Sequence, residues 1–98
     1  METQFYILLS LKTPRGFENY GQYFLGDDWR AAYGLFESLK GSRTIKDSAL
    51  LHVDLMETVN DLPVKIKTVC CTLEELNYNT KLITREVFRL KNLKVYEE

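Results

Sequence analysis

The stretch ALLHVDLMETVNDLPVKIKTVCC, Ala49 to Cys71, contains two strand-like runs separated by one turn signal. Both runs are rich in β-branched and leucine residues, a composition that favours strands. Asn60 and Asp61 lie between them, and these residue types tolerate the positive φ angles of a tight hairpin turn. We therefore predict an antiparallel hairpin with strands at 49–59 and 62–71.

The alternation of this hairpin predicts two different faces. With a two-residue turn, Val59 pairs with Leu62 and Leu50 pairs with Cys71. One face is then apolar and joins the core, with these pairs: Leu51–Cys70, Val53–Thr68, Leu55–Ile66 and Val59–Leu62. The second face carries a mixed set: Leu50–Cys71, His52–Val69, Asp54–Lys67 and Met56–Lys65.

The rest of the chain repeats the order strand, strand, helix. The runs at 3–13 and 18–26 flank turn chemistry around Pro14 and Gly16 and predict a first hairpin. Asp27 or Asp28 is expected to cap a helix, and Gly41 has the residue type of a helix C-terminal glycine. Thr72 begins a capping box for a second, longer helix that ends near residue 92.

These elements predict one α+β domain over residues 1–98, with the order ββαββα. The expected sheet has four strands, is mainly antiparallel, and carries both helices on one face. If residues 18–26 form only a loop, the order becomes βαββα, which is close to a truncated ferredoxin-like arrangement. The length of 98 residues and a hydrophobic content of 45% suffice for one core without a disulfide or structural metal.

Charge and hydropathy favour a cytoplasmic protein that binds neither nucleic acid nor membranes. The net charge is −1, without the basic excess of a nucleic-acid binder. No apolar run approaches the length of a membrane span, and the first residues do not resemble a signal peptide. Two adjacent cysteines are poor disulfide partners, so free thiols and a reducing compartment are expected. The sequence predicts no cofactor and no metal site, because one histidine and two adjacent cysteines do not complete a zinc site.

One constellation has the parts of a thiol enzyme. Cys71, His52 and Asp54 fall on the second face, and Cys71 also precedes a helix start, where the dipole favours a thiolate. A nucleophile, a base and a carboxylate are the groups that covalent catalysis needs. Against catalysis, Asp54 has Lys67 as a closer predicted partner, and ordinary cross-strand packing explains the same residues.

The second face is also the expected contact surface. It holds Tyr6, Leu8, Met56 and Val69 among polar residues, and is too apolar for a surface fully exposed to water. We therefore expect a non-enzymatic interaction or regulatory module, a homodimer that buries this face, with another protein as a possible partner. The alternative is a small-molecule-binding protein or thiol enzyme with a pocket near Cys71 and His52.

A basic row is the last candidate site. Lys81, Arg85 and Arg89 recur every fourth residue along the second predicted helix. This spacing places them on one helix face, where they either bind an acidic partner or form an ordinary solvated surface.

Overall fold

The computed structural model describes residues 3–46 and 48–91. Its elements follow the predicted order ββαββα: β1 (Gln4–Thr13), β2 (Gly16–Gly26), α1 (Trp29–Glu37), β3 (Leu51–Val59), β4 (Leu62–Cys71) and α2 (Leu73–Leu90). The region around residues 18–26 is a strand, which excludes the βαββα alternative. The second helix is the longer one, as predicted, with 18 residues against 9.

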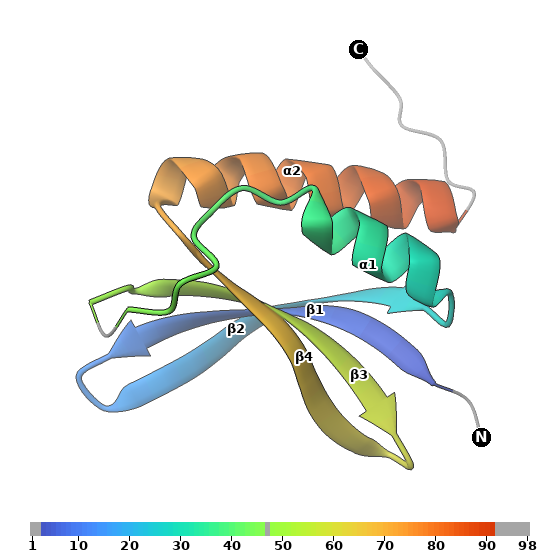
Figure 1. Ribbon diagram of the computed structural model, residues 1–98, viewed down its shortest axis with the longest axis horizontal. Helices are drawn as coiled ribbons and strands as arrows, with labels where there is room; N and C mark the ends of the chain where they lie inside the picture. The colour runs from blue at the N-terminus through green and yellow to red at the C-terminus, as the bar shows by residue number, and fades with distance from the viewer. Residues whose placement is uncertain (1–2, 47, 92–98) are drawn as a thin grey trace.

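The four strands form one sheet in the order β2-β1-β3-β4, and every neighbouring pair is antiparallel. Both helices lie on the same side of this sheet (Figure 1). The core lies between the sheet and the helices, where apolar side chains are removed from water. It consists of Phe5, Ile7, Leu9, Leu25, Ala32, Leu35, Phe36, Leu39, Val53, Leu55, Val69 and Ile83.

Local signals account for the turn between β3 and β4 and for both helix starts. Asn60 and Asp61 have φ angles of 52° and 66°, the left-handed conformation that a two-residue hairpin turn requires. The Asp28 side chain accepts hydrogen bonds from the backbone of α1, so Asp28 is the N-cap. Thr72 and Glu75 form the predicted capping box at the start of α2.

A β-bulge in β4 makes the predicted register of the second hairpin wrong over half its length. Val59 pairs with Leu62 and Met56 with Lys65, as predicted, but Leu55 pairs with Lys67 because Ile66 is an extra residue. A bulge places two residues opposite one, and it therefore exchanges the faces of the residues that follow. Beyond the bulge the observed pairs are Asp54–Thr68, Val53–Val69, His52–Cys70 and Leu51–Cys71.

Gly41 has a different role from the predicted one. Helix α1 ends at Glu37 with Ser38 as its C-cap, so Gly41 lies beyond the helix end. Its φ is +144°, and a Cβ atom there would lie 2.5 Å from the carbonyl oxygen of Cys70. Glycine is therefore required because the connection after α1 passes directly against the backbone of β4.

Candidate functional site

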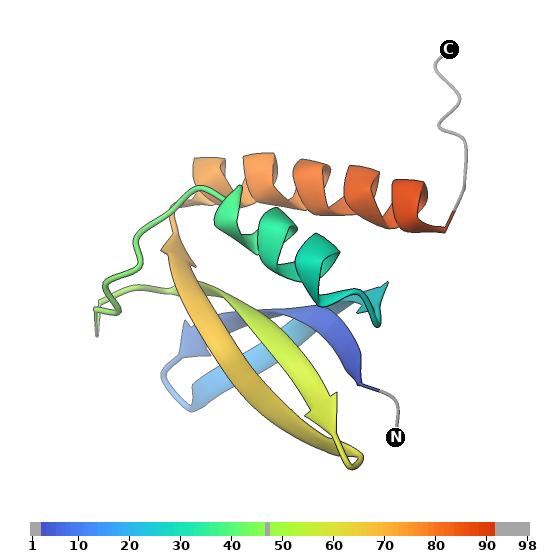
Figure 2. The ribbon, with the colours of Figure 1, turned by 45° about the vertical axis from the view of Figure 1, so that its right-hand side comes forward.

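The surface of the sheet opposite the helices, here called the open face, contains the buried polar side chains of Ser10, His52 and Asp54. The central side chains of the open face are Tyr6, Leu8, Ser10, His52, Asp54 and Met56. Neither α1 nor α2 covers this surface, yet His52 is only 7% exposed and Asp54 only 4%. Figures 1 and 2 show the strong twist of the sheet.

Aromatic rings provide part of the cover. The Phe17 ring of β2 meets the His52 ring edge-on, with 4.8 Å between the ring centroids. Tyr6 and Phe24 form a second ring pair at 5.7 Å. Phe17 and Phe24 remain 58% and 56% exposed, so two large apolar side chains stand at the surface of the open face.

A small pocket of about 180 Å³ opens on this face. Most of the residues that line it are of polar type: Leu8, Ser10, Phe17, Asn19, His52, Asp54 and Lys65. The Ser10 hydroxyl donates a hydrogen bond to the Asn19 side-chain oxygen at 2.8 Å, which ties β1 to β2 at the rim. The pocket therefore has ordered polar groups, although it is small for an organic ligand, whose pockets usually exceed about 300 Å³.

Asp54 is held at the floor of this pocket by two neighbours on β4. Its Oδ1 accepts a hydrogen bond of 2.6 Å from the Thr68 hydroxyl. The Lys65 ammonium lies 3.7 Å from Oδ2 and is itself largely exposed. The ion pair thus compensates for burying the carboxylate, but with Lys65 and not with the predicted Lys67, which pairs with Glu37 on the helix side.

His52 contacts a cysteine, but it is Cys70. The Nε2 atom of His52 lies 3.2 Å from the carbonyl oxygen of Ala49, and Nδ1 lies 3.9 Å from the Sγ atom of Cys70. A carbonyl oxygen only accepts, so the Nε2 position carries the proton in this contact and Nδ1 can accept from the thiol. Both side chains are buried, and Cys70 does not line the pocket.

Cys71 lies on the opposite side of the sheet from His52 and Asp54, so the predicted constellation does not assemble. The Cys71 thiol lies 3.5 Å from the carbonyl oxygen of Lys40, and Asn79 of α2 donates to its sulfur at 3.2 Å. Burial raises the pKa of the Cys71 thiol, and this outweighs the hydrogen bond from Asn79, which lowers it. The expectation of an unusually acidic Cys71 at the helix start is therefore wrong.

The predicted contact residues divide into three groups. Tyr6 is half-buried on the open face. Leu8 and Met56 are also on this face but are 9% and 7% exposed in the single chain, so the expectation that only an assembly removes them from water is wrong. Val69 is fully buried in the core because of the bulge in β4. The exposed rings on this face are instead Phe17 and Phe24; they lie seven residues apart, so simple alternation would separate them, and the register shift near Tyr20 brings them to the same face.

The predicted basic row is split by the structure. Arg89 forms an ion pair with Glu86, one turn earlier in α2. Lys81 and Arg85 line a groove of about 470 Å³ between α2 and β2, together with Tyr23, Thr80, Thr84 and Phe88. This groove was not predicted, because it joins a helix to a strand far away in the sequence.

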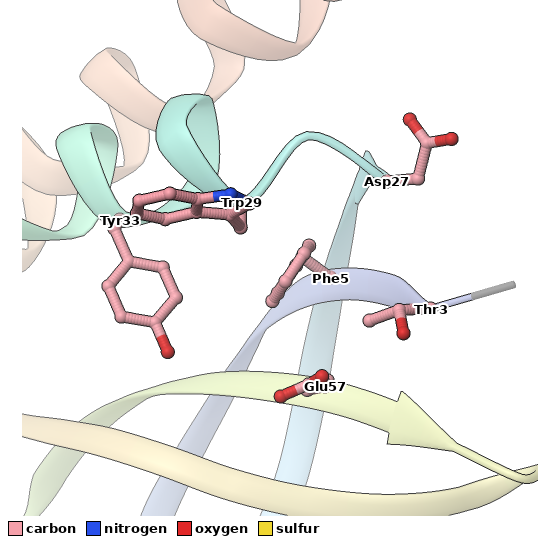
Figure 3. A pocket seen from close by; sticks show the side chains of 6 residues that line it. All are labelled: Thr3, Phe5, Asp27, Trp29, Tyr33 and Glu57. Atoms are coloured by element: carbon pink, nitrogen blue, oxygen red, sulfur yellow. The ribbon is translucent and has the colours of Figure 1, made fainter.

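A third hollow, of about 400 Å³, lies where β1 and α1 begin (Figure 3). Its walls are Thr3, Phe5, Asp27, Trp29, Tyr33 and Glu57. The Trp29 and Tyr33 rings are nearly perpendicular, and Trp29 is 56% exposed. Figure 3 shows the Trp29 ring above Phe5, whereas the Asp27 carboxylate points away from the rings.

The fold and these surfaces define a small α+β domain with a polar pocket on its open face and a basic groove at one edge. Comparison with protein-family models, with curated proteins and with solved structures gave no match. Within residues 3–46 and 48–91, no helix is long and apolar enough to cross a membrane. The same part of the chain contains no group of three histidine, cysteine or acidic side chains placed to hold a metal ion.

Proposed function

We propose that this chain is a small non-enzymatic interaction module that associates with a second copy of itself through the open face. The observation that carries the proposal is the pair of exposed rings on the open face: Phe24, which contacts half-buried Tyr6, and Phe17, which contacts His52. Large aromatic side chains gathered on one surface are typical of the centre of a protein interface.

The buried polar groups beside these rings fit the same role. Ser10, His52 and Asp54 each have a hydrogen-bond partner within the chain. Covering them with a second molecule therefore leaves no unsatisfied group among them, and unsatisfied groups are what make buried polar surfaces unfavourable. The face is thus prepared for contact without local rearrangement.

A thiol enzyme has less support. Cys71 and His52 lie on opposite faces, and the contact that does exist, between Cys70 and His52, is buried. The carboxylate of Asp54 is engaged by Thr68 and Lys65 and not by the imidazole. A cysteine nucleophile needs access to its substrate as well as a base.

We also propose a reducing compartment such as the cytoplasm, supported by two free cysteines.

Light scattering over a concentration series tests the association. The unmodified protein should pass from an 11.5 kDa monomer to a dimer as its concentration rises. Replacing Phe17 and Phe24 together with serine should raise the dissociation constant at least about tenfold, because exposed aromatic residues often dominate interface energy. Leu62→Ser is the matched control, since Leu62 is 66% exposed at the turn between β3 and β4. A monomer at every concentration, or equal effects of both changes, contradicts the proposal.

A further inference from the structure

The two edge strands of the sheet differ in the residues that protect them from pairing with another chain. An edge strand presents unpaired backbone groups to any extended chain, and proteins usually protect such edges with proline, lysine, bulges or covering loops. Strand β4 has all four: Pro63, Lys65 and Lys67, the bulge, and Ser42, whose backbone pairs with that of Cys70 at 2.8 and 2.9 Å. Strand β2, the other edge, has bulges but neither proline nor lysine, and among the described residues no loop backbone pairs with it.

Two bulges bound a regular segment in the middle of β2. The register with β1 shifts near Tyr20 and again near Leu25. Between these positions the residues from Gly21 to Phe24 pair regularly with β1. In the described residues, no backbone segment pairs with the outer side of β2, so this stretch is available to a further strand.

A groove runs beside this edge on the helix side. One stripe of α2 forms its wall, and Tyr23 from the regular part of β2 completes it. Thr80 and Thr84 contribute hydroxyl groups, and Tyr23 with Phe88 contributes apolar surface. The volume of about 470 Å³ is of the size that accommodates side chains of a bound ligand.

The charge of the groove indicates what it can bind. Lys81 and Arg85 are exposed, and neither forms an ion pair with a described residue. Two cations on one wall favour an anionic partner. They also disfavour a second copy at this edge, because symmetric pairing through β2 would place two such basic helices side by side.

We propose that β2 and α2 form a docking groove for an extended acidic peptide segment of another protein. The peptide adds to the outer edge of β2 through its backbone, and its acidic side chains face Lys81 and Arg85. Side chains of an extended peptide alternate between the two sides of the sheet, so acidic residues at every second position all reach the helix side. This surface is separate from the open face, so the two proposals can fail independently.

The direct test uses a short fluorescein-labelled peptide in which glutamate alternates with valine, measured by fluorescence anisotropy. It should bind the full chain, and its affinity should fall as salt is added. A peptide with lysine in place of glutamate should not bind. A peptide that keeps the glutamates but replaces the valines with proline should bind much more weakly, because proline removes the backbone donors that strand addition needs.

Variants locate the site. Lys81→Glu and Arg85→Glu should each weaken binding by roughly five- to tenfold, the size expected for reversing one partly exposed charge contact. Arg15→Glu is the matched control, because it changes the net charge equally in the turn between β1 and β2. Amide hydrogen exchange supplies the backbone evidence: bound peptide should slow exchange within residues 21–24.

Three results overturn the proposal. The first is equal binding of the glutamate and lysine peptides. The second is a loss caused by Arg15→Glu that matches the loss caused by Lys81→Glu or Arg85→Glu. The third is binding without added protection in residues 21–24, since charge attraction alone would then explain the contact. Lys81→Gln, a milder change at an exposed position, replaces Lys81→Glu if that variant does not fold.

Discussion

At the scale of single residues, neighbours in sequence have opposite environments in this protein. Cys70 and Cys71 are adjacent, but the first contacts His52 on the open face and the second contacts Asn79 on the helix side. Strand geometry makes this alternation obligatory. Which cysteine faces which side depended on a single extra residue, Ile66, and not on either cysteine.

We predict that Cys71 reacts with a thiol reagent faster than Cys70 in the native protein. Cys71 is half-buried, whereas Cys70 is 7% exposed, so access decides the order. Because burial raises the pKa of Cys71, its thiolate fraction at neutral pH should be smaller than that of the same cysteine in the unfolded chain. Mass-spectrometric labelling over a pH series should therefore give a midpoint above that measured in denaturant. A midpoint below the denatured value would show that the helix start dominates after all.

Asn79 is the residue whose importance the helical pattern concealed. It is completely buried, its side-chain oxygen accepts from the Lys40 amide at 2.8 Å, and its nitrogen donates to the Lys40 carbonyl at 2.7 Å. One amide side chain thereby ties α2 to the connection after α1. Helical periodicity in the sequence did not single out Asn79, because it identifies apolar positions and not a buried polar residue.

Asn79→Ala should lower the free energy of unfolding by roughly 2–3 kcal/mol, since it leaves both backbone groups of Lys40 without this partner. Asn77→Ala, an exposed change two residues away on the same helix, should cost less than about 0.5 kcal/mol. Urea unfolding followed by circular dichroism measures both values. Similar costs for the two variants would mean that the Lys40 contacts contribute little.

At the scale of elements, capping and turn residues stabilise the element in which they lie. The effect of a glycine depends instead on its backbone conformation and on the space around its Cα atom. Gly34 lies inside α1 with nothing within 4 Å of the position of an added Cβ. Gly41 combines a φ of +144° with a close approach to the backbone of Cys70. The same residue type is therefore replaceable in one element and required in the next connection.

Opposite effects are expected when each of these glycines is replaced with alanine. Gly34→Ala should raise the free energy of unfolding by about 0.5–1 kcal/mol, because alanine favours a helix and glycine does not. Gly41→Ala should lower it by more than about 1 kcal/mol, since the left-handed backbone and the contact with β4 both oppose a side chain. Thermal unfolding of the two variants beside the parent protein tests the pair. A stabilising Gly41→Ala would show that the connection does not approach β4.

At the scale of the whole molecule, two helices cover one side of the sheet and leave the other side to its own side chains. The open face buries Leu8 and Met56 without a covering layer, and the exposed rings of β2 stand beside them. A second copy on this face would extend the particle along the direction from helices to sheet (Figure 1). Association through the open face should therefore make the particle larger along this direction.

Small-angle X-ray scattering should detect this increase in particle size. The single chain has a Cα radius of gyration of 13.8 Å and a largest extent of 41 Å. Raising the concentration should increase both values for the parent protein, and the Phe17 and Phe24 double serine variant should stay near the values of the single chain. Growth of the particle that is identical in the two proteins would place the contact on another surface.

The sequence by itself determined the elements, their order and the antiparallel hairpins. Asn60-Asp61, Asp28 and the Thr72–Glu75 capping box act within a few residues, so their effects can be read without knowing the fold. Only the tertiary structure decided the faces of β4, because the bulge at Ile66 is selected by packing. It brings Val69 into the core opposite Val53, where regular pairing would have placed Thr68. The groove between α2 and β2 likewise exists only after folding, because its walls come from distant parts of the chain.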